Sequence, residues 1–394
     1  MHARSGAGST PRRVAAARFA EAMGHANFRG MSLPRFGHIA YAKSEPPRLR
    51  LSLAESGVAS PDLAALGMPD QAPVPSDPEP VLEPLGRALG ARVQAPGGRV
   101  LVTAGASEAI VATFLGLSDE GEALVESFGY EPHRLTPPAL RIPCRAFERG
   151  RGAAGVAREI ERALGPATRV VMVSDLHNPT GRPLDPGDVE ALDRLAAARS
   201  LWIICDETFR DAAERPLGTL ARRSDRWVTI SSLTKVYGLG GLRIGWIAGS
   251  PEALDLCQNA LNGLSANASL PAAAFALELM PHLDRLRART HAILRENHAR
   301  WRAFAAGRPG VDPNPSGTTT WFAWDREGAG DAFSSFAAAR FDLAVTPGRF
   351  FGDSSGVRVA LGGEPAKFTA ALDQFERAAQ AFDPASAMTL EETS

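Results

Sequence analysis

The chain has 394 residues, of which 44% are hydrophobic and 22% charged, the composition of a folded globular protein. Its 43 basic against 44 acidic residues give a net charge of −1, so we expect neither nucleic acid nor an anionic membrane as a partner. No apolar run approaches the roughly 20 residues of a membrane span. Three cysteines are too few for a disulfide framework or a Cys-based zinc site, which indicates a cytoplasmic protein.

Both ends of the chain differ from the rest. Residues 1–30 carry five arginines and one glutamate, which fits an organellar transit peptide or a flexible basic extension. We favour the extension, because the segment has no apolar core and no cleavage-like site. Residues 383–394 are polar and acidic, and we expect a frayed tail there.

Between these ends, short apolar runs alternate with helical stretches. Runs rich in β-branched residues are typical of buried parallel strands. Six such strands are expected, at 100–103, 123–126, 170–174, 201–205, 228–231 and 244–248. Helices are expected between them, over 107–117 and 188–198. This alternation predicts a doubly wound α/β domain, which we assign to residues 68–290.

The texture of the sequence changes after residue 251. A long amphipathic helical region is expected over 272–304. The elements expected beyond it are strands at 319–324 and 357–361 and helices at 331–340 and 365–382. We assign residues 291–382 to a smaller α+β domain, and we expect the N-terminal segment 31–67 to join it.

Three polar segments follow predicted strands, the place where open α/β sheets bind ligands. They are Asn178-Pro179-Thr180-Gly181, Asp206-Glu207-Thr208-Phe209, and residues 231–245. Taken separately, the first fits a turn and the second a helix cap. The third matches neither the P-loop nor the dinucleotide-binding spacing, because Arg243 stands where the last glycine belongs.

Together and in this order, the segments resemble the class I/II aminotransferase family of fold-type-I pyridoxal-phosphate enzymes. That family carries Asn-Pro-x-Gly, Asp-x-x-Tyr, and Ser-x-Ser-Lys followed by Gly-x-Arg-x-Gly. The chain has Ser232-Leu233-Thr234-Lys235 and Gly241-Leu242-Arg243-Ile244-Gly245 for the last two. The resemblance covers about residues 51–382. It implies a three-layer α/β/α domain with a mostly parallel, mixed sheet, a smaller α+β domain, and a homodimer.

The resemblance also implies roles for the motif residues. Lys235 would form a Schiff base with pyridoxal phosphate and then move protons as general base and acid. Asp206 would keep the ring nitrogen protonated, and Asn178 would donate to the phenolic oxygen. Tyr130 would stack on the ring, although a core tyrosine explains it equally well. The phosphate would meet side chains and amides at a helix start, namely Arg243, Ser232, Gly105, Ala106 and Ser107.

Arg358 is the expected ligand of the substrate α-carboxylate, because a guanidinium binds a carboxylate through two hydrogen bonds. A surface arginine on a strand is the alternative. Asn178 and Gly57 are expected beside the substrate. We expect no metal site, since the histidines of the 272–304 region lack a metal-ligand spacing.

Two departures from the family pattern set the chain apart. Phe209 stands where the family has a tyrosine, so a hydroxyl donor to the phenolic oxygen is lost. No tyrosine lies between Tyr41 and Tyr130, so the tyrosine that a partner subunit lends to the phosphate is missing or replaced, with Ser76 as the candidate. These losses indicate a specialised member of the family.

The leading hypothesis is an aminotransferase that moves an amino group between an α-amino acid and a 2-oxo acid. The nearest alternative is elimination, replacement or side-chain cyclisation of an amino acid with the same cofactor, in specialised metabolism. A non-catalytic regulator on this fold would carry an N-terminal DNA-binding domain. The residues ahead of the fold are too few for one and lack a helix-turn-helix pattern.

Overall fold

The computed structural model describes residues 33–75, 77–150, 155–214, 218–308 and 311–384. Its contacts divide the chain into two units, Met1–Arg35 and Phe36–Ser394, and the elements below belong to the second. The basic extension, Ser76 and residues 385–394 of the expected tail lie outside the described residues. Within the described ranges, no helix is long and apolar enough to cross a membrane.

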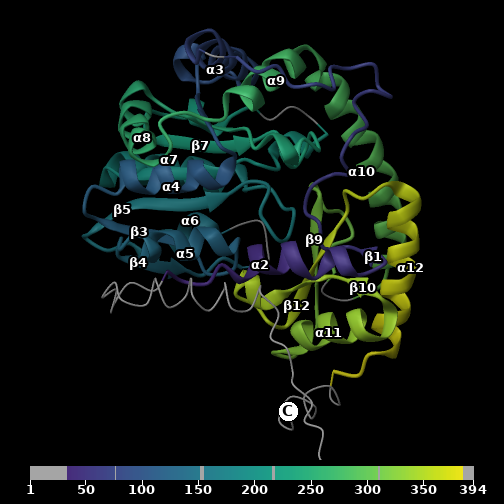
Figure 1. The fold of residues 1–394 in the computed structure, drawn as a ribbon. Coiled ribbons are helices and arrows are strands. Elements are labelled where there is room, and N and C mark those ends of the chain that lie inside the picture. The colour runs from purple at the N-terminus through teal and green to yellow at the C-terminus, as the bar shows by residue number, and fades with distance from the viewer. Residues whose placement is uncertain (1–32, 76, 151–154, 215–217, 309–310, 385–394) are drawn as a thin grey trace, which may run out of the picture. The chain divides into compact units, whose positions relative to one another are not determined.

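A mixed seven-stranded sheet forms the larger part of the fold (Figure 1). In spatial order its strands are β2 (Leu101–Thr103), β8 (Gly245–Ala248), β7 (Trp227–Ser232), β6 (Trp202–Asp206), β5 (Thr168–Ser174), β3 (Glu122–Glu126) and β4 (Cys144–Phe147). β8 runs antiparallel to both neighbours, and the other pairs are parallel. The six predicted strands are present. β4 was not predicted, because it is a short edge strand whose Arg145 is exposed.

Helices cover both faces of this sheet and complete three layers. Helices α4 (Ala106–Leu117) and α8 (Pro251–Leu264) pack on one face, and α6 (Val156–Ala163) and α7 (Pro186–Arg199) on the other. Successive strand residues point to opposite faces. In β5, Met172 accordingly packs with α4 and α8, whereas the preceding Val171 packs with α6 and α7.

The C-terminal elements form a second, smaller set. Its antiparallel sheet has the order β11 (Thr346–Pro347), β12 (Gly356–Ala360), β9 (Thr319–Ala323), and its helices are α11 (Ala329–Phe341) and α12 (Pro365–Ala381). β1 (Leu51–Ser52) pairs in parallel with β10 (Leu343–Ala344), which ties the N-terminal segment to this set. The fold class is therefore the expected one, while the domain boundaries after residues 67 and 290 stay predictions.

One helical prediction needs correction. Residues 272–304 form two helices, α9 (Leu270–Leu279) and α10 (Leu283–Ala305), rather than one region. A 3-10 turn at Met280–His282 separates them, because Pro281 cannot donate a helical hydrogen bond. In Figure 1, α10 runs from α9 to α12.

The remaining elements are α2 (Gly37–Ser44), α3 (Glu79–Val93), α5 (Glu131–Ala139) and 3-10 turns at Pro46–Arg48, Pro96–Gly98, Arg210–Ala212, Leu220–Arg222, Gly240–Leu242 and Gly348–Phe351.

Candidate active site

Lys235 lies in the loop after β7 and lines a cavity of about 240 Å³. The N-terminal segment closes against it: Val58 N donates to Lys235 O at 2.9 Å, and a Cβ on Gly57 would lie 3.5 Å from Lys235 Cδ. Arg358 of β12 and Tyr130, which precedes α5, line the same cavity. The fold thus brings predicted site residues from four distant parts of the sequence to one cavity.

No carboxylate forms an ion pair with the amine of Lys235 in the part of the chain that the structure describes, although the negative charges of Asp206 and Glu55 act on it. Burial, followed by the charges of Arg358 and Arg243, lowers the pKa of Lys235 to about 8. A lowered pKa leaves more of the amine neutral near pH 7, and the neutral amine is the form that attacks a carbonyl. Lys235 is therefore prepared to form a covalent bond with an aldehyde.

Asp206, the last residue of β6, is a buried carboxylate with two hydrogen-bond donors. His133 Nε2 lies 3.1 Å from Asp206 Oδ2, and Thr208 N donates to Oδ1 at 2.9 Å. Burial by itself raises the pKa of Asp206, but the hydrogen bonds of His133 and Thr208 outweigh it, and the net pKa lies below its usual value. Asp206 is consequently an anion, as a partner of a protonated ring nitrogen must be.

His133 is a site residue that sequence reasoning missed. It lies in α5, one turn after Tyr130, and its ring meets Tyr130 edge-on with centroids 5.3 Å apart. Its position, 73 residues ahead of Asp206, belongs to none of the motifs. The Asn178–Gly181, Asp206–Phe209 and 231–245 segments could not have revealed it, because only the folded sheet brings α5 beside β6.

Arg358 is a cation that no carboxylate neutralises among the described residues. It is 2% exposed, and its guanidinium donates to Asn178 Oδ1 at 3.2 Å, to Ala54 O at 2.7 Å and to Thr346 Oγ1 at 3.2 Å. Its Nε is buried without a hydrogen-bond partner in the described part of the chain. Burial lowers the pKa of Arg358 to about 10, which still leaves it charged at neutral pH. A buried cation needs an anion, and a substrate carboxylate would supply one.

Gly105 and Arg243, both predicted to bind the phosphate, lie next to each other, and we call this pair the Gly105–Arg243 cradle. Gly105 precedes α4 with φ of 81°, and no side chain caps that helix, so the amides of Ala106 and Ser107 start it without a side-chain partner. A Cβ on Gly105 would lie 2.7 Å from Arg243 Nη2, and the positive φ of this residue favours glycine by itself. Ser232, at the end of β7, accepts a hydrogen bond from Thr234 N at 3.3 Å. A helix start beside a guanidinium suits an anion.

Two further predicted residues differ in their surroundings. Tyr130 is half-buried at the cavity, where burial and the charge of Asp206 raise the pKa of its phenol. Phe209 lies in the apolar core with Leu233 and Leu176, so it offers packing rather than a hydrogen bond. The structure therefore places Tyr130 at the cavity and Phe209 in the apolar core.

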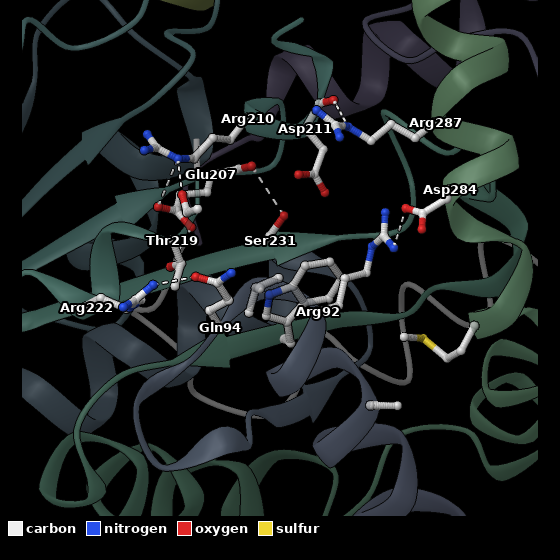
Figure 2. A pocket seen from close by; sticks show the side chains of 15 residues that line it. Arg92, Gln94, Glu207, Arg210, Asp211, Thr219, Arg222, Ser231, Asp284 and Arg287 are labelled. Atoms are coloured by element: carbon white, nitrogen blue, oxygen red, sulfur yellow. Dashed lines mark hydrogen bonds and ion pairs between the residues drawn. The ribbon is translucent and has the colours of Figure 1, made fainter. Parts of the chain in front are cut away.

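The structure also contains a larger cavity, of about 700 Å³, lined by charged side chains near β7 and α10 (Figure 2). Its cations are already bound: Arg92 Nη1 lies 2.9 Å from Asp284 Oδ1, Arg222 contacts Gln94, and Arg287 donates to Asp211 O at 3.0 Å. None of the predicted site residues lines this cavity, which is why it is not assigned as the active site.

The residues around Lys235 fit pyridoxal phosphate. Lys235 would hold its aldehyde carbon, Asp206 its ring nitrogen, and the Gly105–Arg243 cradle its phosphate. Asn178 and Arg358 would remain for the ring oxygen and the substrate. The observation behind this fit is the donor set itself, with two cations that form no ion pair among the described residues and a helix start that lacks a side-chain cap.

Comparisons with known proteins show which sequences and folds this chain is similar to. Residues 85–375 match the family described as aminotransferase class I and II. A probable N-succinyldiaminopimelate aminotransferase, DapC, of Mycobacterium tuberculosis is 35% identical over 193 residues, which are 45% of this chain and 49% of that protein. The match thus spans about half the length of that curated relative.

Two solved structures show the same fold. A PLP-dependent aminotransferase from Streptococcus suis 89-1591 has a TM-score of 0.79 and 20% identity, covering 90% of this chain and 99% of its own. The PLP-dependent cyclase OrfR has a TM-score of 0.76 and 25% identity, covering 87% of this chain and 96% of its own.

Proposed function

Because the chain belongs to the class I and II aminotransferase family, we propose that it moves an amino group between an α-amino acid and a 2-oxo acid, with pyridoxal phosphate as its cofactor. One observation carries this proposal: Lys235 and Arg358, two cations without carboxylate partners among the described residues, line the same cavity. A lysine can hold a carbonyl cofactor, and an arginine can hold the carboxylate that every α-amino acid carries.

Each residue has a distinct task in this reaction. When bound, pyridoxal phosphate supplies a carbonyl for an amino group and a ring that accepts electrons. Asp206, fixed by His133 and Thr208, keeps its negative charge beside the ring nitrogen. Arg358 orients the substrate through its carboxylate. Lys235, with a pKa of about 8, takes the proton from the substrate α-carbon and later returns it.

A panel of α-amino acids tests the proposal directly. The holoenzyme is mixed with each amino acid without a 2-oxo acid, and the 2-oxo acid and ammonia released are measured. An aminotransferase releases up to one 2-oxo acid per active site and no ammonia, and turns over only when a second 2-oxo acid is added. Continuous turnover without an added 2-oxo acid would contradict amino transfer.

Elimination, replacement or side-chain cyclisation is the second candidate. The likeness to the cyclase OrfR supports it, as does Phe209, which replaces the tyrosine hydroxyl of the family pattern with a buried apolar ring. The same panel separates the two functions, because elimination releases ammonia catalytically, and cyclisation gives a ring product without any 2-oxo acid.

We further propose a homodimer in the cytoplasm. The family resemblance supports the dimer, whose partner would complete the phosphate site. The three cysteines support the location, since Cys144, Cys205 and Cys257 are all free thiols. Light scattering of the holoenzyme tests the first part, and fractionation of the source cells tests the second.

A further inference from the structure

The cavity beside Lys235 contains an imidazole for which the proposed reaction has no task. His38, in the first turn of α2, lines this cavity and is 5% exposed. Its Nδ1 is buried without a hydrogen-bond partner among the described residues. A polar ring is costly to bury in this way, so its place at the cavity requires an explanation.

Aromatic neighbours hold the His38 ring in one orientation. The ring meets Tyr130 edge-on, with centroids 5.6 Å apart and planes at 89°. Phe350 and Phe351 lie against it, with centroid distances of 5.7 and 5.3 Å. The guanidinium of Arg358 lies over Phe351, 5.0 Å from its ring centroid. His38 and the expected carboxylate ligand thus share one aromatic neighbour.

The backbone that carries His38 is also fixed. Glu131, the first residue of α5, accepts a hydrogen bond from His38 N at 2.8 Å and so takes the place of a cap for α2, which has no side-chain cap at its start. Gly37 permits the close approach, because a Cβ there would lie 2.9 Å from Phe350 Cε1. Two helices that are far apart in the sequence therefore cooperate to place one side chain.

His38 is uncharged throughout the physiological pH range. Burial, followed by the charges of Arg358 and Lys235, lowers the pKa of His38 to about 2. A neutral imidazole carries one N–H group and one lone pair. An unpaired acceptor is tolerated inside proteins better than an unpaired N–H. We therefore assign the lone pair to the buried Nδ1 and the proton to Nε2, which makes the ring a neutral donor.

We propose that His38 is a specificity-determining residue that donates a hydrogen bond to an oxygen atom in the substrate side chain. This inference rests on the proposed function, in which Arg358 holds the α-carboxylate and Lys235 acts at the α-carbon. With both ends of the amino acid backbone assigned, the side chain is the substrate group left for the other residues that line the cavity.

The donor character of His38 favours an oxygen-bearing side chain. An N–H group can bond an acceptor oxygen, whereas an ammonium group carries donors only. Glu55, the acidic residue among those that line the cavity, is exposed, so no buried carboxylate of the cavity lining would attract a second ammonium group. The substrate class is therefore an α-amino acid with a hydroxyl, amide or carboxylate oxygen in its side chain.

An acid–base role for His38 does not fit. A general acid or base must exchange its proton near the working pH. With a pKa of about 2, His38 stays neutral from pH 5 to 9 and cannot do so. Its contribution is a fixed hydrogen bond, and a fixed hydrogen bond discriminates between substrates that can and cannot accept it.

Matched pairs of amino acids test this inference on the holoenzyme. Threonine and valine form one pair, and glutamine and methionine form another. The two members of a pair have side chains of similar size, but only one of the two side chains contains an oxygen atom. In the pair that contains the better substrate, we expect kcat/KM of the wild-type protein to be at least tenfold higher for the member with the oxygen-bearing side chain. His38→Phe should lower kcat/KM for that member about tenfold and leave its partner within twofold. His38→Gln, which keeps a side-chain donor, should restore part of the preference.

Tyr41→Phe provides a control in the same cavity. The Tyr41 hydroxyl already donates to Val345 O at 2.7 Å, so its loss should change both members of a pair by the same factor. Bound cofactor per chain and the melting temperature show whether each variant is folded. If His38→Phe fails to bind the cofactor, the preference for the oxygen-bearing member of each pair is compared between His38→Gln and wild type, and this comparison decides whether the donor at position 38 sets the preference.

Two results would overturn the inference. An equal loss for both members of every pair would mean that His38 acts on a group common to all amino acids. An unchanged preference in His38→Phe would mean that His38 makes no discriminating hydrogen bond to the substrate side chain. If wild-type protein releases a 2-oxo acid from no amino acid at all, the proposed function itself fails, a result distinct from either of these.

Discussion

Two of the cavities of this protein differ in how carboxylates neutralise their cations. The larger one, about 700 Å³, contains arginines that form ion pairs with carboxylates, Arg92 with Asp284 (Figure 2) and Arg210 with Asp175. The smaller one, about 240 Å³, holds Lys235 and Arg358, neither of which forms an ion pair with a carboxylate among the described residues; Arg358 has amide, carbonyl and hydroxyl acceptors, but its Nε has none.

This difference separates structural charge from functional charge. A buried cation that is paired within the protein has already recovered its solvation, whereas an unpaired one retains a free-energy cost until a ligand arrives. Cavity volume does not make this distinction. On this ground we propose the smaller cavity as the place where an anionic substrate and a carbonyl cofactor bind.

The largest expected effect follows from removal of the amine. Lys235→Ala should abolish turnover, because no other lysine lines the cavity to hold the cofactor or move the α-proton. Steady-state assays with the best amino acid of the panel measure this. A variant that retains more than a few per cent of wild-type kcat would show that the covalent role lies elsewhere.

Removal of the second unpaired cation should have the next largest effect. Arg358→Met keeps an unbranched side-chain stem but removes the guanidinium and its charge. We expect KM for amino acids to rise about 10- to 100-fold, since charged hydrogen bonds contribute about 1.5–3 kcal/mol. Steady-state kinetics would show this rise. Unchanged KM would mean that another group holds the α-carboxylate.

The pKa of Lys235 predicts how pH governs covalent uptake of the cofactor. Its pKa is lowered from 10.5 to about 8, so the reactive neutral amine increases as pH rises, makes up half of the population near pH 8 and approaches its full population only above that. The uptake rate of cofactor-free protein should fall about tenfold per pH unit below that point, to the extent that the neutral amine limits it. Stopped-flow absorbance from pH 6 to 10 measures the rate. A midpoint near 10.5 would contradict the lowered pKa.

An arginine-to-methionine substitution in the larger cavity should have the smallest effect. Arg92 donates to Tyr237 Oη at 3.2 Å and pairs with Asp284, so Arg92→Met removes structural contacts only. We expect a loss of about 1 kcal/mol in the free energy of unfolding and kcat/KM within twofold of wild type. Urea unfolding and steady-state kinetics measure the two. A KM effect as large as that of Arg358→Met would end the distinction between the cavities.

Sequence patterns were sufficient for the central sheet, because buried parallel strands are continuous apolar runs. They were insufficient for β4, an edge strand with exposed Arg145, and for the break between α9 and α10 at Pro281. In both places one residue departs from the average hydrophobic pattern, an exposed arginine in the strand and a proline in the helical region, and this residue decides the local structure.

The candidate site shows a similar division. Lys235 could be placed because it follows a strand of the central sheet, and Arg358, within β12, could be placed through the family resemblance. His133 and His38 could not, since each reaches the site through a contact with a distant element: His133 with Asp206, 73 residues away, and His38 through Glu131, 93 residues away. Both are single histidines in short helices, without a motif around them.

The composition of the chain permits a direct test of the covalent claim. It contains three lysines, Lys43, Lys235 and Lys367, of which Lys43 and Lys367 are exposed. Protein loaded with pyridoxal phosphate, reduced with borohydride and digested should carry the phosphopyridoxyl group on the peptide that contains Lys235, at one group per chain. Label confined to Lys43 or Lys367, or protein that takes up no cofactor when it is supplied in excess, would contradict the central claim.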